Sequence, residues 1–222
     1  MKKGVSFWLN VTLWLATVLV SLWAYPQLPE QAPVHWNYAG EADRYGSKLE
    51  LVAVGPAITL LVLVLSQVLR RLDPLKANYG RFSSSHDTVM TSVIAFMFFL
   101  QMTVIANGLG WAVNVGRIVP VAVGILFIIL GNVMPRVKQN HFMGFRVPWT
   151  LADPRVWDKT QRVGGYTMVL GGLAIMLLGL FAPRLPQAAG IALLLTTVLA
   201  IIFVPTVYAW WLYQKSGTRT VG

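Results

Sequence analysis

The chain has 222 residues, of which 56% are hydrophobic and only 12% are charged, and its mean hydropathy is +0.61. A soluble domain carries about 25% charged residues, so this composition excludes both an ordinary soluble protein and a disordered one. The formal net charge is +10, and the absence of cysteine excludes disulfides, thiolate metal sites and a cysteine nucleophile.

Six apolar segments are candidate membrane spans. A spanning helix needs about 20 mostly apolar residues, and none of the six contains Asp, Glu, Lys, Arg or His. They are apolar all round and lack the one-sided stripe of a soluble helix. We therefore predict an all-α polytopic membrane protein with six transmembrane helices, at Val5–Tyr25, Leu51–Leu69, Thr88–Ala106, Ile118–Met134, Gly165–Phe181 and Ala188–Tyr213.

The first span resembles a signal peptide only at its start, where Lys2 and Lys3 precede the apolar stretch. The stretch is long, and Tyr25-Pro26 stands where a small-x-small cleavage site would be expected. We predict an uncleaved anchor.

The distribution of basic residues predicts the orientation. With a cytoplasmic N-terminus, fourteen of the 18 Lys and Arg residues fall in cytoplasmic segments, and four fall outside, namely Arg44, Lys48, Arg117 and Arg184. By the positive-inside rule both termini are then cytoplasmic. This asymmetry, together with attraction to anionic lipids, accounts for the basic charge, so we expect membrane lipids and no nucleic acid as partners.

The outer loop, residues 26–50, is one of two loops long enough to be structured. Its prolines favour extended backbone, the alternating run Val34–Tyr38 is typical of a strand, and Ala39–Asp43 is typical of a turn. Four interpretations stay open here: a self-satisfied folded cap, a surface that binds an extracellular peptide, a metal site and a general acid–base pair. The last two would use His35 with Glu41 or Asp43.

The cytoplasmic loop, residues 135–164, is the second. Asp153-Pro154 is a typical helix start, and we predict a short basic amphipathic helix that lies on the inner leaflet and ends at Gly164-Gly165. The alternatives are a docking site for a cytoplasmic protein, around Trp149, Trp157 and their basic neighbours, and a phosphate site that uses Arg146, Lys138 and Arg162. No glycine-rich phosphate loop accompanies those cations. A further acid–base pair would join His141 to Asp153 or Asp158.

The chain divides into an N-terminal helix pair with the outer loop, the third helix with its connectors, a second helix pair with the cytoplasmic loop, and the sixth helix with the tail. The corresponding ranges are 1–69, 70–117, 118–185 and 186–222.

The two loops carry a family resemblance. Residues 33–48 follow the pattern P-x-H-W/F-N-x-x-G-x-x-D…S-K, which resembles a bacterial membrane domain of unknown function. Residues 131–165 follow G-N-x-M-P…N…G-x-R-x-P-W-T-L…V-W-x-K-T-x-R-x-G-G, which resembles the signature of SdpI-like proteins. Where many members have a histidine in the K-T-x-R stretch, this chain has Gln161.

The resemblance implies a multi-pass protein of the bacterial inner membrane that gives immunity to a secreted, membrane-active peptide, the sporulation-delaying protein toxin. It also implies a possible cytoplasmic partner, a transcriptional repressor held at the membrane. The candidate functional residues are the matching motif positions: His35, Trp36, Asn37, Gly40, Asp43, Ser47, Lys48, Asn132, Pro135, Asn140, Gly144, Arg146, Pro148, Trp149, Thr150, Trp157, Lys159, Thr160, Arg162 and Gly164.

Two other function classes remain open. The spans hold polar amides but no ionisable group, which argues against a proton-coupled carrier and leaves a facilitator or a lipid-handling protein. A membrane-surface enzyme would have to use His35 with Glu41 or Asp43 in the outer loop, or His141 with Asp153 or Asp158 in the cytoplasmic loop. We expect no enzyme, no catalytic residue, no cofactor and no metal.

Overall fold

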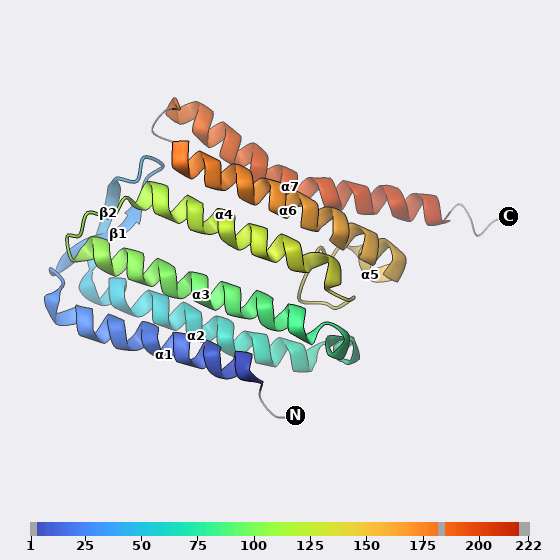
Figure 1. The fold of residues 1–222 in the computed structure, drawn as a ribbon, viewed down its shortest axis with the longest axis horizontal. Coiled ribbons are helices and arrows are strands. Elements are labelled where there is room, and N and C mark those ends of the chain that lie inside the picture. Colours follow the sequence, from blue (N-terminus) through green and yellow to red (C-terminus); the bar gives the residue numbers. More distant parts are fainter. Residues whose placement is uncertain (1–3, 182–184, 218–222) are drawn as a thin grey trace.

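Six long helices dominate the computed structural model, which describes residues 4–181 and 185–217 (Figure 1). Each is long and apolar enough to cross a membrane, which confirms the prediction of an all-α polytopic membrane protein. They are α1 (Val5–Ala24), α2 (Lys48–Leu72), α3 (Ser83–Gly108), α4 (Val115–Val133), α6 (Pro154–Phe181) and α7 (Gln187–Gly217). The shorter elements are η1 (Tyr25–Gln27), β1 (Gln31–Trp36), β2 (Ala42–Ser47), η2 (Lys76–Arg81), η3 (Met134–Arg136) and α5 (Pro148–Ala152).

The helices form two three-helix units placed side by side (Figure 1). Helices α1, α2 and α3 pack together as the N-terminal unit, and α4, α6 and α7 pack as the C-terminal unit, with α3 and α4 as neighbours between them. Each unit has its own buried apolar cluster. The cluster of the C-terminal unit also includes Tyr79 and Phe82 from the segment after α2, so this inner connection already joins the two units.

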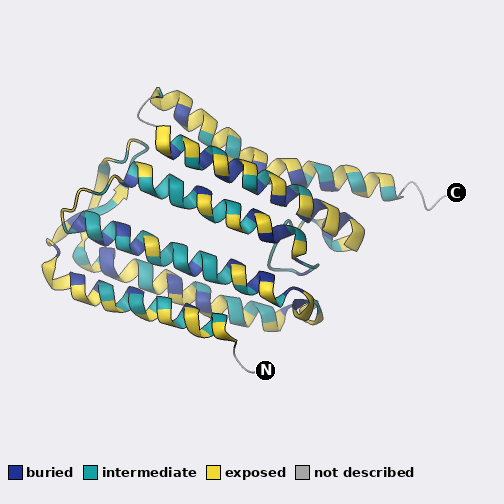
Figure 2. Cartoon of the chain, in the orientation of Figure 1, coloured by how far each residue is buried: buried dark blue, intermediate teal, exposed yellow. Residues whose placement is uncertain are grey.

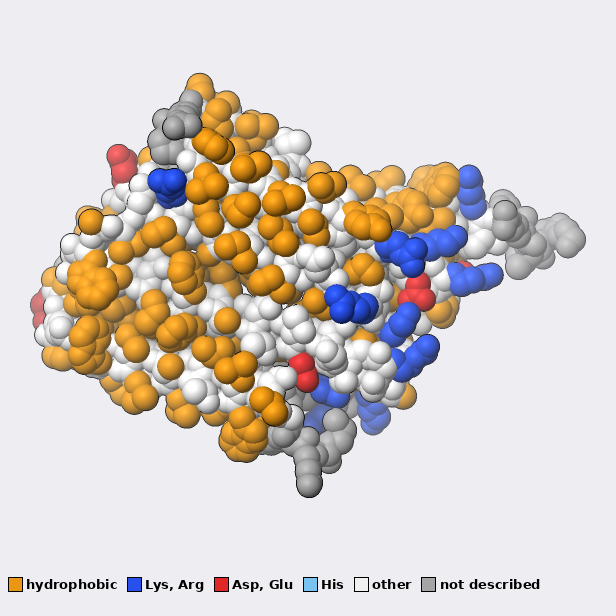
Figure 3. Space-filling view, in the orientation of Figure 1, with side chains coloured by type: hydrophobic (Ala, Val, Ile, Leu, Met, Phe, Trp, Pro, Cys, Tyr) orange, Lys and Arg blue, Asp and Glu red, His pale blue; other side chains and the backbone are white. Residues whose placement is uncertain are grey.

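The burial pattern is that of a protein surrounded by lipid. Exposed residues run along the outward faces of the helices, and the surface along the bundle is largely hydrophobic (Figures 2 and 3). Polar side chains instead lie inside the N-terminal unit, where buried Gln101 donates to the Ser21 hydroxyl and to the Leu51 carbonyl, both at 3.1 Å. Such amides join helices where lipid offers no hydrogen-bond partner.

Lys and Arg side chains gather at the end of the bundle opposite the β1–β2 hairpin (Figure 3). This placement agrees with the positive-inside argument. Following the predicted orientation, we call the hairpin end the outer end and the opposite end the inner end.

Glycines bring α4 and α6 into backbone contact. A Cβ placed on Gly131 would lie 2.6 Å from the Gly165 carbonyl oxygen, and one on Gly165 would lie 2.6 Å from that of Gly131. Gly124 and Gly172 face each other in the same reciprocal way, at 2.5 and 2.6 Å. Both pairs repeat every seven residues, so the two helices meet along a seam without side chains, as close-packed membrane helices do.

The predicted short helix on the inner leaflet is wrong. One continuous helix, α6, runs from Pro154 through the Gly164-Gly165 pair to Phe181. The two glycines do not end the helix. Gly164 lies under the Phe145 ring, and Gly165 lies on the seam with α4. Their small size serves packing, which a search for helix-ending residues cannot distinguish from termination.

Candidate functional site

The outer loop forms a β-hairpin in which β1 pairs with β2 antiparallel, with an irregular register around His35. The first part of the alternating run, up to Trp36, does lie in a strand. The turn covers residues 37–41, two residues earlier than predicted, because Ala42 and Asp43 belong to β2. Ser47 caps α2 by accepting from the Glu50 amide at 3.1 Å, and Lys48 pairs with Glu30 at 2.7 Å. These two motif residues fasten the hairpin to its helix.

His35 meets one carboxylate. Its Nδ1 lies 2.6 Å from an Asp43 oxygen, and the two side chains are 62% and 42% exposed. Glu41 turns away and instead accepts from Asn37 Nδ2 at 3.2 Å, while Asn37 Oδ1 accepts from the Glu41 amide. No group of three His, Asp or Glu that could hold a metal exists among the described residues. The His35–Asp43 contact thus ties two strands together.

The hairpin tip reaches over to the C-terminal unit. Gly40, at φ +83°, sits so close to the start of α4 that a Cβ there would lie 2.6 Å from the Gly116 nitrogen. Beside this contact a cavity of about 340 Å³ opens between the hairpin and the outer ends of the C-terminal helices, and we call it the outer cavity. It is lined by Trp36, Asn37 and Tyr38 from the hairpin, with Val119, Pro120, Ile175, Leu178 and Leu194 among the helix residues.

The cavity is mainly apolar, and its polar groups come from the hairpin. Asn37 contributes its amide, and the Tyr38 hydroxyl is buried without a hydrogen-bond partner among the described residues. Tyr38 also lines an adjoining space of about 270 Å³ next to Asn114, Arg117 and Gln187. A buried hydroxyl without a partner costs free energy unless a ligand or water satisfies it.

At the inner end, Asn140 is fully buried and shapes its own loop. Its Oδ1 accepts from the amides of Phe142 and Met143, at 2.8 and 2.6 Å, and its Nδ2 donates to the carbonyls of Lys138 and Met143. All four bonds stay within this turn. The motif asparagine is therefore explained by the backbone geometry that it enforces.

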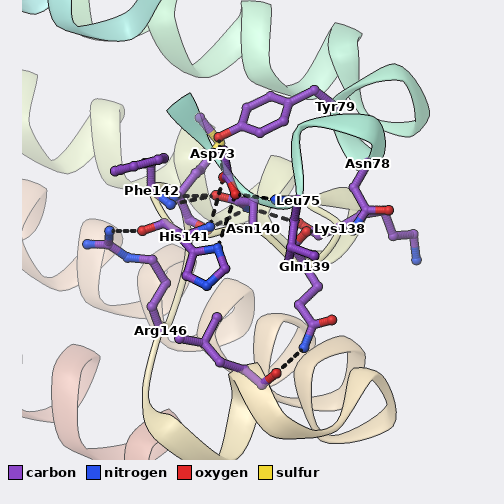
Figure 4. Close-up of polar contacts among 12 residues, drawn as sticks. Asp73, Leu75, Asn78, Tyr79, Lys138, Gln139, Asn140, His141, Phe142 and Arg146 are labelled. Carbon is purple, nitrogen blue, oxygen red and sulfur yellow. Dashed lines mark hydrogen bonds and ion pairs between the residues drawn. The ribbon is translucent and has the colours of Figure 1, made fainter. Parts of the chain in front are cut away.

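Asp73, directly after α2, anchors the cytoplasmic loop to the N-terminal unit (Figure 4). Its fully buried carboxylate accepts from the His141 amide (2.9 Å), His141 Nδ1 (3.0 Å), the Leu75 amide (2.8 Å) and the Tyr79 hydroxyl (3.1 Å). Burial alone would raise the pKa of Asp73, but the hydrogen bonds from His141, Leu75 and Tyr79 outweigh burial and hold this pKa below its usual value.

Further contacts fix the rest of the loop. Asn78 donates to the Gln139 carbonyl at 2.8 Å, and the Gln139 amide donates to the last carbonyls of α5 (Figure 4). Arg146 donates to the His141 carbonyl at 2.6 Å, and Lys138 pairs with Asp158 at 3.1 Å. Of the three cations predicted to hold a phosphate, Lys138 thus has an acidic partner and Arg146 has a carbonyl partner, and the phosphate site stays a prediction.

Gln161, at the position where the family resemblance led us to expect a histidine, binds both polar atoms of one backbone unit. Its Oε1 accepts from the Phe145 amide at 3.0 Å, and its Nε2 donates to the Phe145 carbonyl at 3.1 Å. Gly144, at φ +103°, lies against the side-chain amide of Gln161. Thr150 supports this contact by donating to the Phe145 carbonyl at 2.9 Å.

Two sequence-based pairings at the inner end are wrong. His141 faces Asp73. Asp153 instead accepts from the Arg155 amide at the start of α6, and Asp158 pairs with Lys138. Trp157 cannot dock a partner, because it is completely buried and donates through Nε1 to the Val137 carbonyl at 2.8 Å. Asp73 and Tyr79 were not predicted. The one available signal was an acid four residues after the end of the predicted span Leu51–Leu69.

The motif residues thus fall into two groups at opposite ends of the bundle, separated by the roughly 37 Å length of α2. The hairpin collects His35, Trp36, Asn37, Gly40, Asp43, Ser47 and Lys48. The inner end collects Asn132, Pro135, Asn140, Gly144, Arg146, Pro148, Trp149, Thr150, Trp157, Lys159, Thr160, Arg162 and Gly164. Each group contacts the helix unit to which it does not belong. The two units are therefore joined at both ends, by the contact of Gly40 with Gly116, which we call the outer clasp, and by the contact of Asp73 with His141, which we call the inner clasp.

Comparison with known proteins agrees with both motifs. Residues 136–209 match the SdpI/YfhL protein family, and residues 12–60 match a domain of unknown function, DUF1648. The chain is similar to "Immunity protein SdpI" of Bacillus subtilis (strain 168), with 27% identity over 220 residues, covering 99% of this chain and 100% of that protein. An uncharacterized protein of Archaeoglobus fulgidus is 38% identical over 72 residues, covering 28% of this chain and 39% of its own length. No solved structure matches.

Proposed function

We propose, from the match to the SdpI/YfhL family and the similarity along the whole chain to an immunity protein, that this is an SdpI-like multi-pass protein of the bacterial cell membrane that protects the cell against a secreted, membrane-active peptide. The support is similarity along the whole chain to a protein named for immunity, combined with six membrane-spanning helices. Protection of this kind needs binding and no catalytic step, so we propose that the protein is not an enzyme.

The outer cavity is the observation that carries this function. It lies at the end of the bundle that a secreted peptide would reach first, and the family-motif residues Trp36 and Asn37 are part of its wall. An apolar peptide side chain placed there would leave lipid or water for a space lined by Trp36, Tyr38 and aliphatic groups. The Asn37 amide and the unpartnered Tyr38 hydroxyl would meet the polar backbone of that peptide.

Replacing Trp36 with alanine tests this function. The change removes the largest hairpin side chain of the cavity wall, so we expect protection against the sporulation-delaying peptide to fall by about tenfold or more, as for loss of a buried aromatic anchor. The measurement is survival of a sensitive strain that expresses each variant, after the membrane level of the protein has been matched.

Trp111→Ala is the matched control, because Trp111 also lies at the outer end but is 61% exposed and lines none of the cavities described above. It should protect as the unchanged protein does. Full protection by Trp36→Ala at an equal membrane level would remove the outer cavity as the binding site, and failure of the unchanged protein to protect would remove this peptide as the target.

Recruitment of a cytoplasmic repressor is a second candidate function. The first turns of α6 bury Val156, Trp157 and Thr160 and expose Arg155, Lys159 and Arg162, which gives a basic face at the inner end. The exposed face, without Trp157, is what we propose as the contact for a protein with an acidic surface.

A charge reversal tests recruitment. Arg162→Glu should reduce the membrane-bound fraction of the repressor by about tenfold while leaving protection intact, because Arg162 is exposed and remote from the outer cavity. Arg136→Glu, an exposed inner-end change outside α6, serves as the control. An unchanged bound fraction for Arg162→Glu rules out this face.

A further inference from the structure

A long groove separates the two helix units. It has a volume of about 670 Å³, lies between α3 and α4, and is lined almost entirely by apolar side chains, among them Phe96, Phe99, Val121, Ile125, Leu126 and Ile129. The glycine seam lets α4 approach α6 closely, whereas within the described residues no glycine brings α3 and α4 into similar contact. The clasps at the two ends hold the units together and leave the groove open along its side.

Arg117 stands at the outer end of this groove, where it also borders the space beside Tyr38. The other outer cations of the described residues have acidic partners, since Arg44 pairs with Glu50 and Lys48 pairs with Glu30. The Arg117 guanidinium is exposed and has no side-chain partner within residues 4–181 and 185–217.

The local field around Arg117 favours an anion. Arg117 lies in the first turn of α4, which contains no acidic residue, so the positive end of the helix dipole adds to the charge of the guanidinium. A guanidinium at a membrane surface binds phosphate through paired hydrogen bonds. The feature therefore has the chemistry of a phosphate contact directly above an apolar groove.

The length of the groove matches one leaflet. From Arg117 to Ile129 α4 rises about 18 Å, whereas half of the hydrocarbon core measures about 15 Å. A single acyl chain spans one leaflet, so its length suits the groove.

We propose that the groove between α3 and α4 is a specific phospholipid site, in which Arg117 holds the phosphate of an outer-leaflet lipid and one acyl chain lies along Phe96, Phe99 and Ile125. The lipid fills the side opening between the two units. This site is separate from the outer cavity, so it stands or falls independently of the immunity function.

Native mass spectrometry of the full chain, purified in detergent and exposed to vesicles of defined phosphatidylglycerol and phosphatidylethanolamine content, tests the site. The unchanged protein should retain one phospholipid. Arg117→Gln, which removes the cation, and Ile125→Trp, which fills the groove, should each lower this occupancy by about tenfold. Arg44→Gln and Leu199→Trp, at an outer ion pair and on the exposed face of α7, should retain the lipid.

Each possible result either supports the lipid site or overturns it. Equal lipid retention in all five proteins overturns the site, because only bulk lipid would behave in that way. If the lipid is lost from Arg117→Gln but not from Ile125→Trp, the groove does not hold the acyl chain, and that part of the proposal is overturned. Displacement of the bound lipid by inorganic phosphate alone would overturn it in the same way. A lipid-free dimer that Ile125→Trp dissociates identifies a second copy as the occupant and also overturns the proposal.

Discussion

Asp73→Asn is expected to destabilise the protein by about 3 kcal/mol or more and to release the cytoplasmic loop from the N-terminal unit. The buried carboxylate accepts four hydrogen bonds, and hydrogen bonds to a charged group contribute about 1.5–3 kcal/mol each. The asparagine side chain has the same shape as the aspartate, but its NH₂ group is a donor. It would face the donors on His141, Leu75 and Tyr79, which need an acceptor. The measurement is thermal unfolding in detergent, with limited proteolysis of residues 138–147 as the local readout.

Asp158→Asn is the matched control for this change. Asp158 lies in the same region and pairs with Lys138, but its side chain is 53% exposed, so its loss should cost no more than about 1 kcal/mol. Equal effects of the two substitutions would show that the Asp73 contacts do not hold the units together.

The same carboxylate predicts an acid-sensitive part of the stability. The hydrogen bonds from His141, Leu75 and Tyr79 lower the pKa of Asp73 in the folded protein, so its contribution is present above the unfolded value of about 3.9 and is lost as the pH falls through the lower folded value. The difference in melting temperature between the unchanged protein and Asp73→Asn should therefore be large at neutral pH and shrink below about pH 4. A constant difference would contradict this.

Hydropathy predicted the spans because membrane insertion depends on local composition. All six predicted segments lie within the helices of the structure, since about 20 apolar residues can satisfy their backbone in lipid only as a helix. The hairpin strand was partly predictable, because the alternating run Val34–Tyr38 is local, although β1 covers Gln31–Trp36. These features need no knowledge of what lies elsewhere in the chain.

The inner-end site was only half predictable, because its contacts are not local. The sequence suggested His141 as half of an acid–base pair, but its partner Asp73 lies 68 residues earlier and belongs to the other unit. Sequence spacing instead favoured Asp153 and Asp158, which stand nearer in the chain and have other partners. Likewise, the motif tryptophan Trp157 looked available for docking, although its indole is needed inside the loop.

Glycine shows the same limit at the centre of the bundle. A glycine pair is compatible with a helix end and with a close helix contact, and only the neighbour decides between them. For Gly165 the neighbour is Gly131 on α4, and both approach the opposite backbone within a distance that excludes a side chain. The resulting seam joins the two helices that carry the inner motif.

Gly131→Leu should therefore cause the largest loss of all, several kcal/mol, and prevent a stably folded C-terminal unit. A leucine at this position has to displace the Gly165 carbonyl and the Val169 side chain, because its Cβ alone would lie 2.6 and 2.8 Å from them. Overpacking of a well-packed core by side chains costs about 1–3 kcal/mol. Here the obstacle is the backbone of a helix, so α4 and α6 must separate along the seam. The measurements are yield of monodisperse protein in detergent and its melting temperature.

Ala200→Leu separates this effect from the mere addition of an apolar side chain. Ala200 lies on the exposed face of α7, where a larger side chain meets lipid, and its change should leave yield and melting temperature within a few degrees of the unchanged protein. A reciprocal variant, Gly165→Leu, should fail as Gly131→Leu does, because its Cβ would meet the Gly131 carbonyl at the same 2.6 Å. If either glycine tolerates leucine with normal stability, α4 and α6 are not held by backbone contact, and the inner clasp would have to carry the packing of the C-terminal unit.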